Sequence, residues 1–366
     1  MFTLADYLRP LLAVLPPVLI SPAALADLTA VAGLMPEALD YYNAVLEFWV
    51  SDPRRAADMQ GCAAVDRQGQ AALAGLAAPG SPAESLFAHP AWRRIAAFCW
   101  AWADLASPLS RHVDHIWFDF DLIAGRPAIP VPFVLFGLLP LGLRVPPEAC
   151  TEESRATALA VAEAGVALLQ GAPLPPDVRR QLARCFHALP PGAQIAFTAV
   201  PLARPTTDIR LIVKGLAFDA FAGYMREIGW PGDPAQVGPA VATAARCSDV
   251  TWLDLDVGAG IAPKFGMEYH LYDGEPATEP RWAAFFDFLQ DQGLCSPEKR
   301  DALLSILGSS DRETLGDLWP QSLRLAEPLL GPLAYRTHVR ALHSAKLVYH
   351  SDGSYTAKVY VSSYFR

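Results

Sequence analysis

Charged residues are scarce in this chain of 366 residues. Only 18% of the residues are Asp, Glu, Lys or Arg, while 52% are hydrophobic. This balance excludes a disordered or fibrous protein and predicts a well-packed core. Positive charge is the scarcer sign, because 29 Lys and Arg stand against 38 Asp and Glu for a formal charge of −9. The sequence therefore lacks the basic surface typical of proteins that bind nucleic acid or anionic membranes.

Cysteine motifs and long uninterrupted apolar runs are also missing. The six cysteines include no C-x-x-C pair, so we expect reduced thiols in a cytoplasmic protein. Asp6, Arg9 and the Pro16-Pro17 pair interrupt the apolar N-terminus, which predicts neither a signal peptide nor a membrane span. No G-x-x-x-x-G-K-[ST], G-x-G-x-x-G or G-x-S-x-G motif stands at a predicted strand–helix junction. Nucleotide hydrolysis and dinucleotide chemistry therefore lose support.

Residue patterning divides the chain into two regions. Residues 1–110 predict a helical N-terminal region, because 36–50, 54–77 and 84–106 are rich in Ala and Leu and lack strand alternation. Residues 111–366 predict hairpins that alternate with helix pairs. The predicted strands are 115–122 and 131–138, 193–200 and 208–215, 250–257 and 264–272, and 344–350 and 354–364. No linker separates the regions, so we expect one structural domain with the first region packed on the second.

Alternate positions of these strands carry an unusual mixture of side chains. A two-residue turn at Asp352-Gly353 would pair Tyr349 with Thr356 and place Tyr349 on the same side as Lys358. Cations, carboxylates and aromatic rings share the polar faces: Trp117, Asp119 and Asp121; Arg210 and Lys214; Trp252, Asp254 and Asp256; Lys264, Glu268 and His270; Tyr349, Thr356, Lys358, Tyr360, Ser362 and Tyr364. Large rings beside charges indicate an enclosed, ligand-facing surface rather than one in bulk water.

Two architectures fit this alternation. Closing the sheet into an antiparallel β-barrel with helices outside, an α+β fold, would gather all these side chains around one cavity and remove exposed strand edges. The alternative is an open antiparallel sheet that helices cover on one face, with the polar residues on an ordinary solvated face. We expect the barrel, because the aromatic content of the polar faces favours enclosure.

Two short motifs connect the sequence to a known family. Lys358-Val359-Tyr360 matches a Lys-x-Tyr pattern, and Arg210-Leu-Ile-Val-Lys214 resembles an Arg-x-Lys pattern with a longer interval. Together with the helix–hairpin–helix repeat, they make residues 115–366 resemble the αββα aromatic prenyltransferases, the PT-barrel proteins, and especially the dimethylallyltryptophan synthase branch. Two features depart from the family pattern. Eight strands are predicted where the family has ten, and Lys264 is followed by Gly266 rather than a tyrosine.

The resemblance implies an enzyme of natural product biosynthesis that transfers an isoprenoid group from an allylic diphosphate to an aromatic small molecule or peptide side chain. It implies that cations hold the diphosphate, here Arg210, Lys214, Lys264 and Lys358. Aromatic rings would shield the allylic cation, with Tyr349, Tyr360, Tyr364, Trp252 and Trp117 as candidates. Asp119 and Glu268 suit removal of the final proton. No metal cofactor is required, although Mg²⁺ is compatible with this chemistry.

Other interpretations stay open. A noncatalytic barrel could bind a peptide or partner of a biosynthetic pathway without clustered cations, whereas a diphosphate site predicts at least three cations that converge on one anion. The pairs Asp119/Asp121 and Asp254/Asp256 could hold Mg²⁺ in a metal-dependent enzyme, but we expect pairing with Arg or Lys. The pairs His112/His115 and His338/His343 lack further ligands at zinc spacing.

Overall fold

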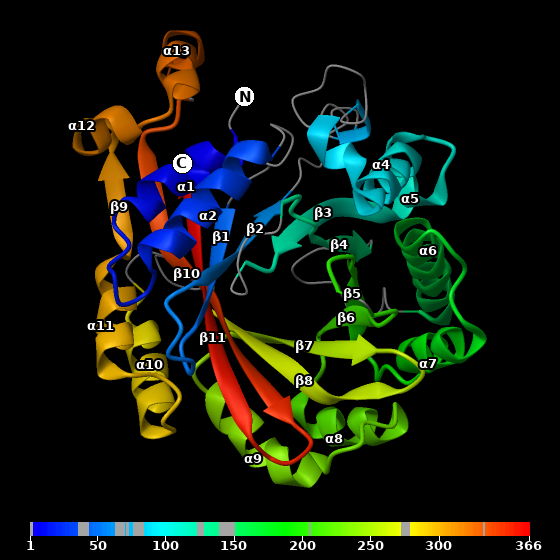
Figure 1. Cartoon of the computed structure of the whole chain (residues 1–366). Coiled ribbons are helices and arrows are strands. Elements are labelled where there is room, and N and C mark those ends of the chain that lie inside the picture. Colours follow the sequence, from blue (N-terminus) through cyan, green and yellow to red (C-terminus); the bar gives the residue numbers. More distant parts are fainter. Residues whose placement is uncertain are drawn as a thin grey trace.

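A closed antiparallel β-barrel forms the centre of the molecule (Figure 1). The computed structural model describes residues 3–35, 44–62, 70, 73–75, 84–122, 128–138, 151–204, 206–271, 279–331 and 334–366. Ten strands follow one another around the ring in chain order: β1 (Ala44–Trp49), β2 (Ala57–Cys62), β3 (Val113–Phe120), β4 (Phe133–Leu138), β5 (Gln194–Pro201), β6 (Ile209–Lys214), β7 (Val250–Val257), β8 (Ile261–His270), β10 (Thr337–His350) and β11 (Tyr355–Phe365). The short β9 (Gly308–Asp311) pairs with the first residues of β10, Thr337 to Arg340.

Helices surround the barrel on its outside (Figure 1). They are α1 (Leu4–Leu12), α2 (Pro22–Leu34), α4 (Pro90–Ala103), α5 (Pro108–His112), α6 (Glu152–Gln170), α7 (Pro176–His187), α8 (Phe218–Glu227), α9 (Pro234–Ala245), α10 (Arg281–Asp291), α11 (Pro297–Ser305), α12 (Arg312–Leu315) and α13 (Gln321–Leu330), with 3₁₀ turns at η1 (Glu84–Ala88) and η3 (Gly316–Leu318). Several begin with proline after a capping side chain, as Ser21 and Asp233 do for α2 and α9. Such a proline loses no helical hydrogen bond.

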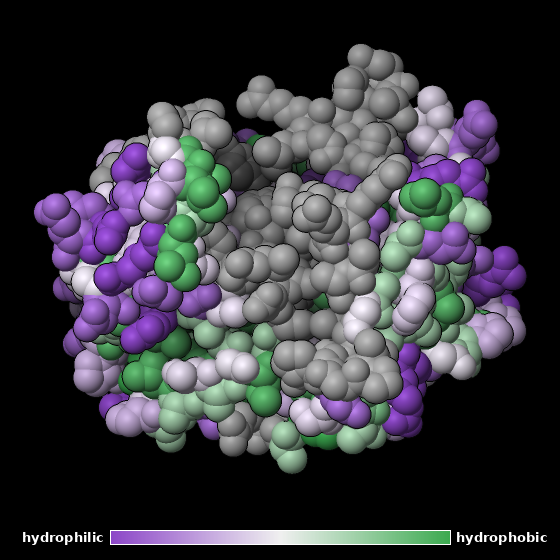
Figure 2. Space-filling model, turned by 90° about the horizontal axis from the view of Figure 1, so that it is seen from above, coloured by the Kyte–Doolittle hydropathy of each residue, from purple (hydrophilic) through white to green (hydrophobic). Residues whose placement is uncertain are grey.

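The hydrophobic core lies between the barrel wall and the helices. Outward-facing strand residues such as Phe118 and Phe265 are buried there against aromatic residues of the helix layer, as in the stacked pair of Trp92 and Phe118. Polar residues occupy much of the outer rim in the view from above, with small apolar patches between them (Figure 2). Among the helices that the structure describes, none combines the length and the apolar composition that crossing a membrane requires. The inward-facing strand residues form a separate interior, the lumen of the barrel.

The first hairpin corrects the sequence-based prediction for the N-terminal region. Strands β1 and β2 occupy parts of 36–50 and 54–77, which were predicted to be helical. Residues 36–43, 63–69, 71–72 and 76–77 lie outside the described residues, and residues 70 and 73–75 are helical as predicted. The prediction of a helix within 84–106 is confirmed by α4. Strand β1 is buried along nearly its whole length, so its two faces differ little in polarity and the period of two is weak.

The last hairpin corrects the predicted register. Tyr349 pairs with Tyr355 rather than with Thr356. The His350 N–H donates to the Ser354 carbonyl at 2.9 Å, and the His350 carbonyl accepts the Gly353 N–H at 3.0 Å. The loop therefore has three residues, with Gly353 at φ 87°. A shift of one residue moves every side chain of β10 to the other face. Tyr349 therefore points into the outer core, where its hydroxyl lies 3.1 Å from that of Tyr269.

Candidate active site

A polar cavity of about 90 Å³ opens inside one end of the barrel. Because a single water needs only about 10–15 Å³ measured in this way, the cavity has room for several waters or for the oxygens of a small anion. Its lining includes five carboxylates and five cations among the described residues: Glu47, Asp119, Asp121, Asp254 and Asp256, and Arg204, Arg210, Lys264, Lys346 and Lys358. Trp49 and Val348 also line it. The strand period of two accounts for this convergence, since the inward positions of seven strands meet here.

One side of the cavity has an excess of positive charge around Asp256. Arg210 donates from Nε to Asp256 Oδ1 at 2.9 Å, and Lys264 Nζ lies 3.6 Å from Asp256 Oδ2. Burial alone would raise the pKa of Asp256, but Arg210 first, with Lys264 and Arg204, lowers it to about 2. The side chain of Lys264 is 41% exposed, so an incoming anion can reach it.

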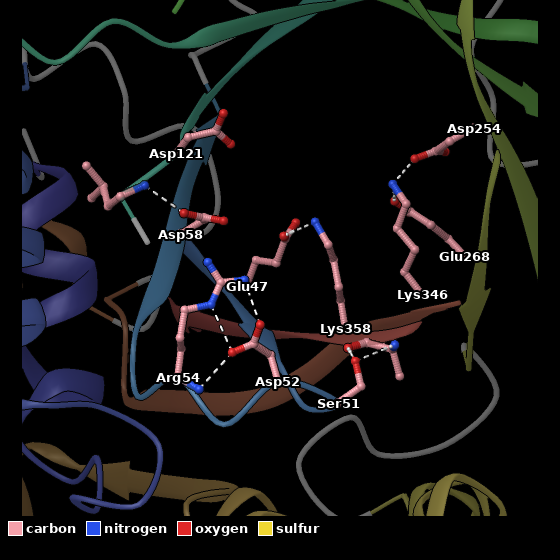
Figure 3. Close-up of polar contacts among 12 residues, drawn as sticks. Glu47, Ser51, Asp52, Arg54, Asp58, Asp121, Asp254, Glu268, Lys346 and Lys358 are labelled. Atoms are coloured by element: carbon pink, nitrogen blue, oxygen red, sulfur yellow. Dashed lines mark hydrogen bonds and ion pairs between the residues drawn. The ribbon is translucent and has the colours of Figure 1, made fainter. Parts of the chain in front are cut away.

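Lys346 of β10 extends along the barrel wall over β8 and reaches carboxylates on β8 and β7 (Figure 3). Its ammonium donates to Asp254 and lies 3.3 Å from Glu268. Burial, followed by the charges of Arg210 and Lys358, holds the pKa of Lys346 well below its usual range. A Cβ at position 266 would lie 2.4 Å from Lys346 Cε. Gly266 therefore stands where the family pattern has a larger residue because the Lys346 side chain occupies that space.

Lys358 is held between a carboxylate and an aromatic ring. Its ammonium donates to Glu47, the residue two positions before Trp49 on β1, and lies 3.9 Å from the centroid of the Trp49 ring. Burial would raise the pKa of Glu47, but Lys358 outweighs burial and the pKa is lowered. Lys299 of α11 fixes the start of the β1–β2 loop, because its ammonium donates to the carbonyl oxygens of Trp49 at 2.9 Å, Arg54 at 3.3 Å, and Asp52. The Trp49 ring is thus anchored beside the cations.

The opposite side of the cavity is acidic. Its carboxyl groups come from the first three strands, and we call them the acidic wall: Glu47 of β1, Asp58 of β2, Asp119 of β3, and Asp121, which directly follows β3. Figure 3 places Asp58 and Asp121 across the lumen from Asp254, Glu268 and Lys346. Asp58 accepts the Leu122 N–H at 2.6 Å, and burial together with the charge of Glu47 raises its pKa to about 7. Burial and the same carboxylates raise the pKa of Asp119 well above its usual range. Arg204 pairs with Asp121 at 2.7 Å.

The other half of the lumen is filled by aromatic and histidine side chains. Trp117, Phe197 and Trp252 belong to one apolar cluster, and the His270 ring lies 4.0 Å from that of Trp252. Lys214 also lies in this half, with its ammonium 3.8 Å from the Trp252 centroid. Burial lowers the pKa of Lys214 to about 8. Lys214 lies four positions after Arg210 along β6, or roughly 13 Å, so the two cations do not share one anion site.

The structure brings together part of the predicted site. Arg210, Lys264, Lys358 and Asp119 line the cavity as a group. Lys214, Trp117 and Trp252 lie in the aromatic half of the lumen, Glu268 lies beside Lys346 without lining the cavity, and Tyr364 packs against Val339 and Ala341. Tyr360 is buried opposite Glu47 on the neighbouring strand. Tyr349, as described above, faces away from the lumen, so its predicted place beside Lys358 is wrong.

Sequence reasoning missed Glu47, Trp49, Asp58, Arg204 and Lys346. A signal for β2 was present, because Asp58 and Gln60 alternate with Ala57 and Met59. The prediction that these aspartates pair with Arg or Lys is confirmed for Asp121, Asp254 and Asp256. Among the residues that the structure describes, no three His, Cys, Asp or Glu side chains are arranged to hold a metal ion.

Comparison with known proteins supports the fold. Neither a protein-family model nor a curated protein matches the sequence. The crystal structure of 5-dimethylallyltryptophan synthase from Streptomyces coelicolor matches with a TM-score of 0.54 and 15% identity, over 98% of this chain and 97% of that chain. The structure of AnaPT from Neosartorya fischeri matches with a TM-score of 0.51 and 13% identity, over 100% of this chain and 92% of that one. The chain has the PT-barrel fold, which confirms the resemblance to αββα prenyltransferases at the level of the fold.

Proposed function

We propose that this chain binds an allylic diphosphate in the polar cavity and transfers its isoprenoid group to an aromatic acceptor. The observation that carries the proposal is the convergence of Arg210, Lys264 and Lys358 on one cavity from three different strands. Lys346 and Arg204 add two further cations to the same lining. Cations that approach from several strands suit an anion with charge on many oxygens, and the fold shared with a dimethylallyltryptophan synthase supports the same chemistry.

The chemistry follows from the distribution of charge. The bond between the allylic carbon and the diphosphate oxygen breaks, and Arg210 and Lys264 stabilise the negative charge that develops on the leaving group. The Trp49 and Phe133 rings already hold cations, since Lys358 lies 3.9 Å from Trp49 and Arg210 lies 5.0 Å from Phe133. Rings in this position stabilise an allylic cation in the same way. The acceptor ring then forms a bond to the allylic carbon and loses a proton.

Two carboxylates are candidates for receiving that proton. Asp119 lines the cavity, whereas Glu268 is occupied by Lys346 and lies behind the lining. Burial and the charges of Glu47, Asp121 and Asp58 raise the pKa of Asp119. Once ionised, a carboxylate with a raised pKa is a better proton acceptor than one held by a cation. We therefore assign the proton acceptor role to Asp119 ahead of Glu268.

A second candidate function is supported by the pairing of the cations. Arg204, Arg210, Lys264, Lys346 and Lys358 each have a carboxylate within 4 Å. An incoming diphosphate must compete with these carboxylates, whereas a noncatalytic barrel that binds a peptide or partner keeps them in place. Binding of diphosphate therefore separates the two functions.

The test combines turnover with binding. Purified protein is incubated with dimethylallyl, geranyl or farnesyl diphosphate and acceptors that contain tryptophan or tyrosine, with and without Mg²⁺, and products are detected by mass spectrometry. We expect a mass gain of one isoprenoid group and calorimetric binding of inorganic pyrophosphate. Lys264→Gln should weaken that binding about 10-fold, while Arg179→Gln, which removes an exposed charge on α7, should not change it. Absence of both turnover and pyrophosphate binding would refute prenyl transfer and leave the noncatalytic function.

A further inference from the structure

A second pocket lies at the rim of the barrel, next to the polar cavity, and we call it the rim pocket. Its volume is about 200 Å³, and most of its lining is apolar: Phe120, Leu122, Ile129, Pro130, Val131, Leu202 and Ala203, with His89 and Asp121. The strand register explains why these residues meet. Phe133 of β4 pairs with Asp119 of β3 on one side and with Pro201 of β5 on the other. The segments after β3, before β4 and after β5 therefore leave the barrel at the same end.

The polar groups of the rim pocket are already engaged by the protein. Asp121 forms an ion pair with Arg204 at 2.7 Å. His89 Nδ1 accepts a backbone N–H at the start of α4 at 3.2 Å, and the Pro130 carbonyl accepts the Trp92 indole N–H at 2.7 Å. The pocket consequently offers a ligand apolar contact, and burial of apolar surface is what would favour binding there.

The rim pocket adjoins the polar cavity. Asp121 lines both, and Arg204, which lines the polar cavity, directly follows Ala203. The guanidinium groups of Arg204 and Arg210 lie 4.6 and 5.0 Å from the centroid of the same Phe133 ring. An anion held by these cations therefore has an apolar pocket beside it.

The lumen leaves less room for a long apolar group than the rim does. The polar cavity has about 90 Å³, less than half the volume of the rim pocket. The other half of the lumen holds the neighbouring rings of Phe197, Trp252 and His270. Because one water takes about 10–15 Å³ on the same measure, the rim pocket has room for roughly a dozen groups of that size, comparable with the carbons of two isoprene units.

We propose that the donor is an allylic diphosphate longer than dimethylallyl, such as geranyl or farnesyl diphosphate, and that its tail lies in the rim pocket. This inference rests on the proposed function, because it names the class of donor that the same site takes. The diphosphate lies with Arg210 and Lys264, the reacting carbon lies beside the Phe133 ring, and the isoprene units beyond it extend toward Val131 and Leu202. Each added unit buries apolar surface outside the lumen, whereas dimethylallyl is too short to reach the rim pocket.

The experiment compares unreactive donors that differ in chain length. In dimethylallyl, geranyl and farnesyl thiolodiphosphates, sulfur replaces the oxygen that joins the allylic carbon to the diphosphate. Their affinities for the full chain are measured by isothermal calorimetry at concentrations where they do not self-associate. We expect the geranyl compound to bind at least about 10-fold more tightly than the dimethylallyl compound, and the farnesyl compound to bind no more weakly than the geranyl one. Equal affinities for the dimethylallyl and geranyl compounds, or no binding by any of the three, would overturn the proposal.

Variants at one exposed position locate the tail. Ala203 lines the rim pocket and is exposed, so Ala203→Trp fills the pocket without entering the core. We expect the preference for the geranyl over the dimethylallyl compound to fall below about 3-fold. Ala160→Trp, at an exposed position of α6, is the matched control and should keep the preference.

A second substitution covers the case in which Ala203→Trp does not fold. Ala203→Glu places a charge in the same pocket from the same exposed position, and should also reduce the preference for the longer donor. An unchanged preference in a folded Ala203 variant would contradict the assignment of the tail to this pocket.

The outcome also separates this inference from the proposed function. Turnover is measured in parallel with dimethylallyl, geranyl and farnesyl diphosphates and acceptors that contain tryptophan or tyrosine. Equal turnover and equal affinity for all chain lengths would support prenyl transfer and refute the role of the rim pocket. A preference for the longer compounds that depends on Ala203, without turnover of any acceptor, would support the rim pocket and refute prenyl transfer.

Discussion

Asp58 and Asp256 lie in the same barrel and differ in the direction in which the protein shifts their pKa. Burial raises the pKa of Asp58 to about 7, whereas Arg210 and Lys264 overcome burial and lower that of Asp256 to about 2. Both side chains project inward, and both are withdrawn from bulk solvent. The difference shows that neighbouring charges, not burial alone, decide the ionisation of a carboxyl group here. The barrel consequently has an acidic side, built from the first three strands, and a side rich in cations, built from later ones.

The sharpest way to break this comparison is to remove the cation that dominates one side. Arg210→Leu deletes two hydrogen bonds to Asp256 and leaves that carboxylate facing the cavity. We expect the affinity for inorganic pyrophosphate, measured by calorimetry, to fall about 100-fold. Arg179→Leu, on the exposed surface of α7, is the control and should bind as the wild type does. Wild-type affinity in Arg210→Leu would place the anion site elsewhere.

The next largest effect concerns the stability that Asp256 supplies. Its pKa of about 2 in the folded protein lies below the reference value of 3.8. The stabilisation is therefore complete above about pH 4 and is lost as the pH falls through 2. Asp256→Asn should lower the free energy of unfolding by about 2 kcal/mol at neutral pH, as measured by urea denaturation. The stability curves of variant and wild type should approach each other in acid; a constant gap at all pH values would contradict this account.

Asp58 should show the opposite sign. Its pKa of about 7 lies above the reference value of 3.8, so the folded protein holds a proton that the unfolded chain releases. The contribution of this group to stability therefore falls as the pH rises from about 4 through 7. Asp58→Asn retains the bond from the Leu122 N–H and removes the ionisation, and its advantage in stability over the wild type should be larger at pH 8 than at pH 4. A variant that is less stable than the wild type at pH 8 would show that the folded protein stabilises the ionised form of Asp58.

The smallest effect sharpens the comparison from outside the cavity. Tyr349→Phe removes one partner of the buried pair with Tyr269 and should cost about 1 kcal/mol in urea denaturation. Because Tyr349 faces the outer core, the affinity for pyrophosphate should change less than about 2-fold. A large loss of affinity in a folded Tyr349→Phe protein would mean that the ring reaches the lumen after all.

The sequence predicted four of the five hairpins, and with them the barrel, because their inward and outward faces differ in polarity. It did not predict β1, where Glu47 is the one charged residue between Val45 and Trp49 on the inward face, so the alternation is weak. Lys346 was missed because the last hairpin was predicted with a two-residue turn, whereas the structure has a three-residue loop with Gly353 at positive φ. One extra loop residue exchanges the two faces of β10, which puts Lys346 inside the barrel in place of Tyr349. Arg210, Lys264 and Lys358 were found because their strands alternate cleanly.

The distribution of charge could not be predicted, for a different physical reason. Glu47 and Lys358 are 311 positions apart, and Asp254 and Lys346 are 92 apart. Alternation assigns a side chain to a face of its strand but does not say which strand lies across the lumen. The opposite pKa shifts of Asp58 and Asp256 depend on such distant neighbours, which come together only in the closed barrel.

The pairing of β1 with β11 has a consequence for how the protein is made. A ribosome delivers Glu47 311 residues before Lys358, so the nascent chain carries an open strand edge on β1 and an uncompensated carboxylate while the residues between them are made. Ring closure between such distant segments is entropically slow, and exposed edges invite association with other chains. The hairpin of β10 and β11 supplies the strand that pairs with β1, so its addition is the step that closes the barrel around the cavity.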